Sequence, residues 1–459
     1  MQVQKKTSTG RWAVGQIAAV PLRPVPDAGQ RRAGFAHWPH IINLGLLITG
    51  LGVGQGTILV VQTWLLASGQ LELLSWFGTH YSFAIFGIIL TDGGTSTILA
   101  REVARLSSGQ GATEEFWRIF CETVVFRLSM AALMGIAAAV YAMTAASDGF
   151  SRSYLLCALP GLLFWAGNAT GLLDGLKLSG ISGITGSFAY AASAIALALV
   201  PNASPESAGL ILGGAFSTGY LLTVLVQWTV LRRYGWKPRI KKVTAAGLVL
   251  AFKNASAMLF QLMPGQIVVR VQLTLSGTYL GPETTAMFTY VRQIVTALTM
   301  IVAVFLRVDF PGLVQKVSRT KKPSFGGILG AQKMTLSCAV AFTVGAIIVA
   351  SSSFMMPQSR FSAAASTLLT FSPTILTSSV CVMMMQGMVA LGAYAPVARI
   401  TALSVAVGIA VSCLLFTTGG LYALVAGELV THLLIFVLIS NHLSRLSYLS
   451  QSSPERLNF

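Results

Sequence analysis

Long apolar stretches, separated by short polar connections, run along this 459-residue sequence from about position 41 onward. Each stretch is long enough for a helix that crosses ~30 Å of hydrocarbon, which takes about 20 residues. We therefore expect an all-α integral membrane protein. The pattern predicts about twelve membrane-spanning helices, at 41–66, 74–99, 119–145, 153–176, 178–200, 206–231, 247–276, 283–307, 327–350, 362–390, 393–417 and 420–442.

The connections between the predicted helices alternate in charge. The basic set contains Arg101, Arg105, Arg118, Lys177, the cations of 232–242 and those of 316–322. The other set, 65–75, 146–152, 201–205, 277–282 and 351–361, has only Arg152 and Arg360 as cations. Because positively charged loops stay in the cytoplasm, the basic loops and both termini are predicted to be cytoplasmic. We expect a multi-pass protein of a bacterial inner membrane.

The basic stretch 232–246 divides the predicted helices into six and six. An even number in each half gives both halves the same orientation in the membrane. A weak echo between 65–81 and 273–290, each with a Ser-Gly pair followed by aromatic residues, supports two related halves. We expect a basic, disordered tail (1–40), two six-helix lobes (41–231 and 247–445) joined by the linker 232–246, and a second tail (446–459).

Composition limits the class of protein further. With 54% hydrophobic residues, 10% charged residues and a mean hydropathy of +0.72, nearly all of the chain is membrane span. No connection is long enough for a folded catalytic domain, so we do not expect an enzyme. The net charge of +17 lies in loops and the N-terminal tail, where it meets anionic lipid head groups rather than nucleic acid. Five cysteines occur singly, without metal-binding spacing, so no disulfide, metal or cofactor is predicted.

Four glycines alternate in the first predicted helix, at Gly50, Gly52, Gly54 and Gly56. Small residues four apart let two membrane helices approach closely. Glycine also weakens a helix, so a helix that bends is the alternative reason for these glycines. Pro264 removes a backbone hydrogen bond in the seventh predicted helix and should kink it.

Ionisable side chains inside a membrane helix cost several kcal/mol unless they face a partner or a water-filled cavity. Three cations fall inside predicted helices: Arg127, Arg292 and Arg270. Arginine stays charged and can bind two phosphate oxygens at once, so a cavity lined by them would bind an anionic head group. The alternative, which we favour for Arg270, is that each arginine pairs with a carboxylate or carbonyl, or extends to the membrane surface.

The titratable candidates for ion coupling are Asp92, Glu428 and His432. Glu428 and His432 are four residues apart and share one face of the last helix, where they could hold a proton. A structural hydrogen-bonded pair is the alternative. Asp174 and Lys177, one turn apart, are predicted to form an ion pair near the inner end of the fourth helix.

Two groups of motifs resemble the polysaccharide flippase family of the multidrug/oligosaccharidyl-lipid/polysaccharide exporter superfamily. The first half carries Phe77-Gly78-Thr79-His80-Tyr81, Thr91-Asp92-Gly93-Gly94 and Leu99-Ala100-Arg101-Glu102-Val103-Ala104-Arg105. The second half carries Leu280-Gly281-Pro282-Glu283, Tyr290, Gln293 and Pro311. The resemblance covers about residues 41 to 445.

This resemblance implies two lobes around a central cavity that opens to one side of the membrane at a time. It implies that the protein flips undecaprenyl-diphosphate-linked oligosaccharide from the cytoplasmic to the outer leaflet. The candidate coupling ion is H⁺ or Na⁺, and the candidate protein partners are the polymerase and glycosyltransferases of the same pathway. The family's cation-lined cavity carries over by residue type to Arg127, Arg270 and Arg292. Asp92 stands on a motif position.

Other functions remain open. A cation-coupled multidrug exporter of the same superfamily would need acidic residues in its cavity, and few anions lie at mid-depth here. A peptidoglycan-precursor flippase usually has two additional helices. A polysaccharide polymerase or ligase should carry a large outer loop with catalytic Arg or His residues, and the outer loops of this chain are short.

Overall fold

The computed structural model describes residues 40–68, 70–107, 112–146, 148–320, 324–352 and 361–452. Over these ranges the chain forms α-helices and no strand, and twelve of the helical segments are long and apolar enough to cross a membrane. The predicted all-α class with about twelve spans is confirmed. Of the predicted N-terminal tail, only His40 is among the described residues, and α15 continues into the predicted C-terminal tail as far as Ser452.

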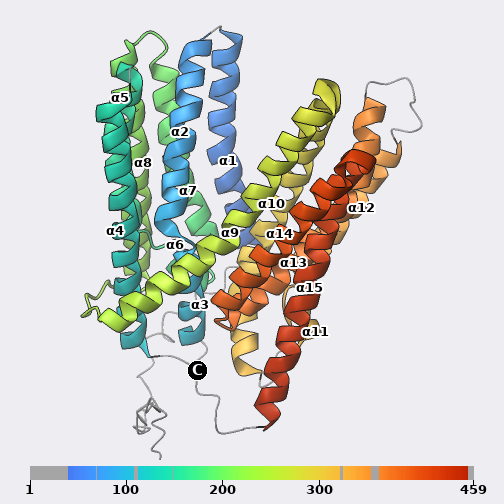
Figure 1. Cartoon of the computed structure of the whole chain (residues 1–459). Helices are drawn as coiled ribbons and strands as arrows, with labels where there is room; N and C mark the ends of the chain where they lie inside the picture. Colours follow the sequence, from blue (N-terminus) through green and yellow to red (C-terminus); the bar gives the residue numbers. More distant parts are fainter. Residues whose placement is uncertain are drawn as a thin grey trace, which may run out of the picture. The chain divides into compact units, whose positions relative to one another are not determined.

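The first half of the described chain contains eight helices, coloured blue to green in Figure 1. They are α1 (His40–Ala67), α2 (Leu71–Asp92), α3 (Thr95–Ser107), α4 (Thr113–Thr144), α5 (Gly149–Ala166), α6 (Thr170–Gly175), α7 (Ser179–Leu199) and α8 (Pro205–Arg233). In this half α5 packs along α8 and α1 packs along α7.

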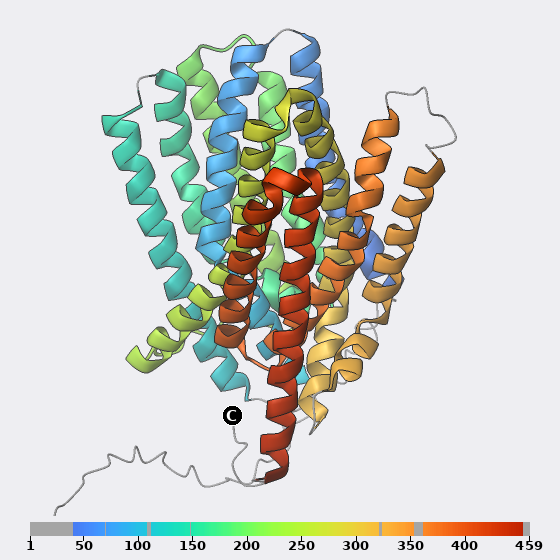
Figure 2. The same cartoon turned by 45° about the vertical axis from the view of Figure 1, so that its right-hand side comes forward.

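The second half contains seven helices, coloured yellow-green to red. They are α9 (Ala245–Tyr279), α10 (Gly281–Arg319), α11 (Phe325–Ala331), α12 (Lys333–Ser352), α13 (Phe361–Ala390), α14 (Tyr394–Gly419) and α15 (Leu421–Ser452). Here α14 packs along α15, which Figures 1 and 2 show side by side, and α10 packs along α13. Pro264 lies inside α9, which continues past it.

Polar residues at the ends of the apolar stretches set where several helices begin. The side chains of Asp148, Ser204 and Thr244 each accept a hydrogen bond from a backbone N–H of the first turn that follows. These N–H groups have no partner inside the helix, so a side-chain oxygen at this position stabilises the start by about 1 kcal/mol. Pro205 follows Ser204 directly, where its missing N–H is not needed.

Two of the predicted spans are interrupted rather than continuous. The second ends as α2 at Asp92 and begins again as α3 at Thr95, because Gly93 and Gly94 have φ angles of +51° and +73°. These left-handed conformations favour glycine. The fourth span also breaks, between α5 and α6 around Asn168, but there Gly167 has an ordinary φ angle of −86°. Both breaks place non-helical backbone inside a membrane-spanning segment.

The glycines of α1 divide into two pairs with different surroundings. A Cβ added at Gly50 would lie 2.5 Å from the backbone of Gly183 in α7, and one at Gly54 would lie 3.1 Å from Ser187. Gly52 and Gly56 have no atom of another element that close. The predicted close packing therefore holds for Gly50 and Gly54.

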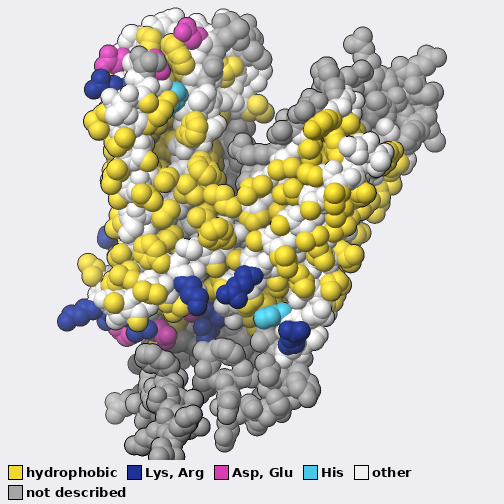
Figure 3. All heavy atoms as spheres, viewed as in Figure 1, with side chains coloured by type: hydrophobic (Ala, Val, Ile, Leu, Met, Phe, Trp, Pro, Cys, Tyr) yellow, Lys and Arg dark blue, Asp and Glu magenta, His cyan; other side chains and the backbone are white. Residues whose placement is uncertain are grey.

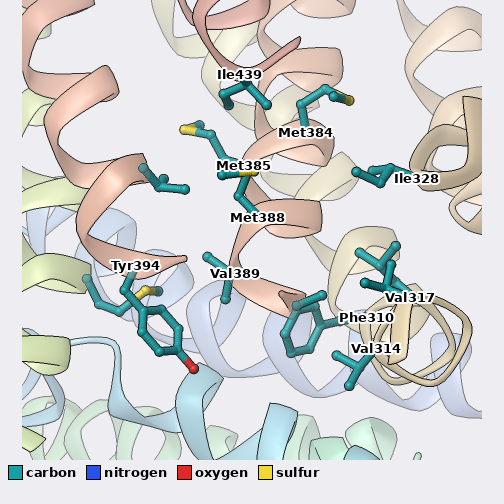
Figure 4. Packing of buried hydrophobic residues seen from close by; sticks show 14 of the residues in the cluster. Phe310, Val314, Val317, Ile328, Met384, Met385, Met388, Val389, Tyr394 and Ile439 are labelled. Atoms are coloured by element: carbon teal, nitrogen blue, oxygen red, sulfur yellow. The ribbon is translucent and has the colours of Figure 1, made fainter. Parts of the chain in front are cut away.

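The two halves of the compact unit 39–459 meet through α3, α6 and α1 against α10, and through α4 against α9. A buried hydrophobic cluster joins them, in which Ile98, Ala100 and Ala104 of α3 occur together with residues of α9, α10, α11, α13, α14 and α15. Figure 4 shows Met385 and Met388 of α13 in the middle of this cluster, with Phe310 of α10 on one side and Tyr394 of α14 on the other.

The helix ends near this cluster carry the basic connections of the sequence. Figure 3 shows hydrophobic side chains over the helices and Lys and Arg side chains gathered toward the lower end of the face in view. The contacts between the halves therefore lie toward the end of the bundle that has the basic loops.

Candidate functional site

Arg127, from the middle of α4, is fully buried with 0% of its side chain exposed. Its Nη2 pairs with a carboxylate oxygen of Asp92 at 2.7 Å. The guanidinium also donates to Thr95 Oγ1 at 2.7 Å and to the backbone oxygen of Asn168 at 2.9 Å. A further hydrogen bond of 3.0 Å goes to Ser96 Oγ.

These partners lie at the two interrupted spans. Asp92, Thr95 and Ser96 flank the break between α2 and α3, and Asn168 lies in the break between α5 and α6. Backbone groups released by a break inside a membrane must find partners within the protein. Arg127 donates a hydrogen bond to the backbone oxygen of Asn168, in one break, and pairs with the carboxylate of Asp92, beside the other. A single side chain therefore connects α4 to both breaks. The structure thus brings together Arg127 and Asp92, which the sequence had assigned to substrate binding and ion coupling separately.

Arg292 and Glu428 form the corresponding pair in the second half. Nη1 of Arg292, on α10, lies 2.5 Å from Oε1 of Glu428 on α15. Gln272 of α9, only 2% exposed, donates to the same carboxylate oxygen at 3.0 Å. The side chain of Arg292 is 17% exposed, and its Nε–H has no hydrogen-bond partner among the described residues. The Nε atom itself is buried, so Arg292 combines a partly exposed side chain with one buried donor left unsatisfied by the described residues, in contrast to the fully bonded Arg127.

His432 lies one turn beyond Glu428 on α15. Its Nδ1 is 2.9 Å from the hydroxyl of Thr377 on α13, whereas Glu428 bonds to α9 and α10. The two side chains share a helix but have different hydrogen-bond partners. Their role in ion coupling stays a prediction.

A third ion pair joins the two halves of the molecule. Nε of Arg307, on α10, donates to Asp174 of α6 at 2.7 Å, and its Nη2 donates to Ser182 Oγ of α7 at 2.8 Å. The predicted pair between Asp174 and Lys177 is therefore wrong. Lys177, whose backbone is left-handed with φ of 63°, instead donates to Gln315 of α10 at 3.3 Å.

Sequence reasoning missed Arg307, Gln272 and Asn168 as members of these clusters. Arg307 stood at the end of the predicted span 283–307, but α10 continues to Arg319, so this arginine lies inside the helix. Asn168 could have been identified from the sequence, because a polar amide side chain within an apolar stretch indicates an interior hydrogen-bonded site.

Some predicted positions lie outside the described residues. The backbone of Arg270 belongs to α9, but its side chain is not described, and its substrate-binding role stays a prediction. The side chains of four motif residues are not described either: Pro282, Glu283, Tyr290 and Gln293. Within the described part of the chain, no group of three or more His, Cys, Asp or Glu side chains could hold a metal ion.

Taken together, the interior carboxylates of Asp92, Asp174 and Glu428 each pair with an arginine. Pairing offsets much of the cost of placing a charge in a low-dielectric interior, and breaking such a pair leaves an uncompensated charge. An anion that reached Arg292, or a proton that reached Glu428, would therefore change which contacts hold α10 to α15. This chemistry suits a protein that changes conformation when an ion binds.

Neither a family model nor a curated protein matches the sequence. Several solved structures have a similar fold. A MATE protein in the bent conformation superposes with a TM-score of 0.71 at 13% identity, over 91% of this chain and 96% of its own. A MOP superfamily transporter from Pyrococcus furiosus gives 0.69 at 13% identity, over 90% and 96%. An outward-facing multidrug resistance MATE family transporter of the MOP superfamily also gives a TM-score of 0.69 at 13% identity, over 90% of this chain and 96% of its own.

These matches extend over nearly the whole of both chains. At 13% identity they show the fold and not the substrate. The chain therefore has a MATE-like transporter fold with twelve candidate membrane spans.

Proposed function

We propose that this protein is a transporter that flips undecaprenyl-diphosphate-linked oligosaccharide from the cytoplasmic to the outer leaflet of a bacterial inner membrane by alternating access. In this orientation the basic loops and both termini are cytoplasmic, following the distribution of Lys and Arg. The fold supports the transport mechanism, and the setting of Arg292 supports the choice of an anionic substrate.

The argument for an anion depends on the charges that remain available in the interior. Asp92, Asp174 and Glu428 already have arginine partners, so a cationic drug would have to displace an arginine to reach any of these three. Two further buried carboxylates, Asp309 and Glu122, accept hydrogen bonds from Thr335 and Thr244. The Arg292 side chain is partly exposed, and its buried Nε–H has no partner among the described residues. A diphosphate offers several oxygens to such a guanidinium. Arg127 and Arg270 remain candidates for the same role.

Ion coupling follows from the same pair. Glu428 and a diphosphate would compete for Arg292, so protonation of Glu428 would release the guanidinium for substrate. We propose Glu428 and His432, with Asp92 as a further candidate, as the residues that bind the coupling ion, H⁺ or Na⁺. The polymerase and glycosyltransferases of the same pathway are the expected protein partners.

A multidrug exporter is the second candidate function. It is favoured by the fold likeness to a structure described as a multidrug resistance MATE family transporter. In that case the apolar interior would carry the substrate, and the ion pairs would serve conformational change alone.

One experiment separates the two functions. The full chain is expressed in two hosts, one that lacks its own lipid-linked oligosaccharide flippase and one that lacks its drug exporters. We expect restored polymer export in the first host and unchanged drug susceptibility in the second. The reverse result would establish the exporter.

The role of Arg292 is tested in the same flippase-deficient host. Arg292→Ala should reduce polymer export at least tenfold while membrane abundance stays normal, and Arg292→Lys should restore part of it, because an ammonium cannot make the forked contact. Arg319→Ala, at an exposed arginine on the same helix, serves as the control. Normal export by Arg292→Ala at normal abundance would exclude this arginine from substrate binding.

A further inference from the structure

A groove opens between α2, α4 and α5 in the first half of the molecule, away from the ion pairs. It has a cavity volume of about 470 Å³, within the ~300–1,000 Å³ typical of sites for small ligands. The three helices pack against one another, but residues with little or no side chain face the space between them, including Gly87, Ala138 and Ala158. The groove is therefore a consequence of small residues at facing positions.

The mouth of the groove faces the region that lipid chains occupy. Phe83 of α2 is 67% exposed and Tyr141 of α4 is 51% exposed, and both line the groove on helices that are candidate membrane spans. Most of the lining is apolar, with Met134, Leu159 and Leu162 among it. Apolar cavities are not filled by water, and a groove that opens toward the lipid chains is suited to a hydrocarbon.

The groove has polar residues toward one end only. Ser151 lies in the first turn of α5, close to the connection that joins α4 to α5. Leu162 lies eleven residues further along, which is ~17 Å at 1.5 Å per residue, or about half of a ~30 Å hydrocarbon core. The groove therefore extends from the membrane surface opposite the basic loops to near the membrane centre, the depth of a single leaflet.

Charged and polar groups surround the surface end. Arg152, one of two cations in the weakly basic set of loops, is exposed beside Ser151. Asp148 accepts hydrogen bonds from the backbone N–H and hydroxyl of Ser151. Burial raises the pKa of the Asp148 carboxyl, but these hydrogen bonds outweigh it and hold the pKa below its usual value. His80 donates from Nδ1 to the Trp76 carbonyl in the tautomer that makes this 2.8 Å contact, which leaves Nε2 as an acceptor.

We propose that this groove binds one acyl chain of a membrane phospholipid from the leaflet opposite the basic loops, with the head group level with Ser151 and Arg152. A ligand with one polar end, one apolar end and the length of a single leaflet fits this geometry. Phospholipid is also the hydrocarbon that the mouth of the groove meets at the highest concentration. The bound chain completes the packing of α2 against α4 and α5 and stabilises the folded state by mass action. The proposal uses the orientation given above only to name this leaflet as the outer one.

The test uses a phosphatidylglycerol that carries a photoreactive diazirine in one acyl chain, with the full chain reconstituted in vesicles. Mass spectrometry of the cross-linked peptides should place the label on the groove-lining parts of α2, α4 and α5. Ala138→Trp fills the groove and should reduce this cross-linking at least fivefold. Ala137→Trp, one residue along on the exposed face of the same helix, should leave it unchanged. Cross-linking of Ala138→Leu, which adds a smaller side chain to the groove, is measured as well in case the Trp variant fails to reach the membrane.

Two outcomes would overturn the proposal. One is labelling that spreads evenly over the lipid-facing helices and does not respond to Ala138→Trp or Ala138→Leu. The other is groove labelling that a polyprenyl phosphate removes but an excess of unlabelled phosphatidylglycerol does not, because the occupant would then be an isoprenoid chain. The first outcome does not depend on which substrate the protein transports, and the second would place the isoprenoid part of the proposed substrate in the groove.

Discussion

At the scale of single residues, Arg127 and Arg292 look alike in the sequence and differ in the structure. Both are arginines inside apolar stretches, but Arg127 has no exposed surface and has four hydrogen-bond partners at two helix breaks. Arg292 is partly exposed and keeps an Nε–H without a partner among the described residues. The first setting is that of a residue bonded on all sides, and the second has a partly exposed guanidinium, which is why we propose Arg292 for substrate binding.

The contribution of Arg127 to stability can be measured through its pair with Asp92. Arg127→Met leaves the Asp92 carboxylate, 18% exposed, without its cation. Removing one partner of a buried pair costs about 3–5 kcal/mol. We expect a lower thermal unfolding temperature in detergent and lower membrane abundance. Replacing both charges, as Asp92→Asn with Arg127→Met, should recover most of the loss, because neither charge then remains buried.

Transport by this double variant separates the two roles of Arg127. If Arg127 also binds substrate, the double variant should be abundant but inactive. Normal transport at normal abundance would limit Arg127 to the fold. A double variant as unstable as Arg127→Met would contradict the pairing itself.

The sequence predicted which residues belong to the charged interior better than it predicted their partners. A charge within an apolar stretch is visible from hydropathy alone, so Asp92, Arg127 and Glu428 were found. A partner depends on how each helix is rotated and on which helices are neighbours. Asp174 therefore pairs with Arg307 of the other half, rather than with the nearby Lys177.

At the scale of helices, the spans were predictable and their interruptions were not. Hydropathy reports the length of an apolar stretch, and this length determines whether it can cross the membrane. It does not distinguish a glycine that packs from a glycine that ends a helix. Gly50 and Gly54 lie within an unbroken α1, whereas Gly93 and Gly94 end α2 with positive φ angles.

The packing of α1 on α7 gives a prediction with a control on the same helix. Gly50→Leu would place its side chain against the backbone of Gly183, since a Cβ there already approaches to 2.5 Å. The backbone cannot yield as a flexible side chain would, so the two helices must separate. We expect a loss of membrane abundance and an unfolding temperature in detergent several degrees below that of the wild type.

Gly52→Leu adds the same side chain where no atom of another element lies within 4 Å of the new Cβ. It should leave both measurements near the wild-type values. Equal damage from the two substitutions would mean that the flexibility of α1, rather than its contact with α7, is what the glycines provide.

At the scale of the whole molecule, polar contacts between the halves gather around α3, α6 and α10. Arg101 of α3 donates to the backbone oxygen of Ala390 at the end of α13 at 2.9 Å, and Arg307 of α10 bonds to Asp174 of α6. A transporter that alternates access must break such contacts to open at this end. They are individually modest, because hydrogen bonds to charged groups contribute roughly 1.5–3 kcal/mol each, which allows the equilibrium between conformations to be reversible.

The last prediction concerns this equilibrium. Arg307→Ala removes the hydrogen bonds to Asp174 and Ser182. Losing the ~2 kcal/mol of one such bond already shifts a two-state equilibrium by roughly thirtyfold. We expect a larger population that is open at the basic end. Pulsed electron paramagnetic resonance can measure this population as a longer distance between two spin labels. The labels are placed at the exposed positions Arg233 of α8 and Arg319 of α10, each changed to Cys in a background without the five native cysteines.

Two further variants serve as controls for the ion pair. Exchanging the charges, as Asp174→Arg with Arg307→Asp, should return most of the population to the short distance. Arg232→Ala, at an exposed arginine at the same end, should leave the distance distribution of the wild type unchanged. An unchanged distance distribution in Arg307→Ala would mean that the hydrophobic cluster around Met388 and Phe310 holds the two halves together without this ion pair.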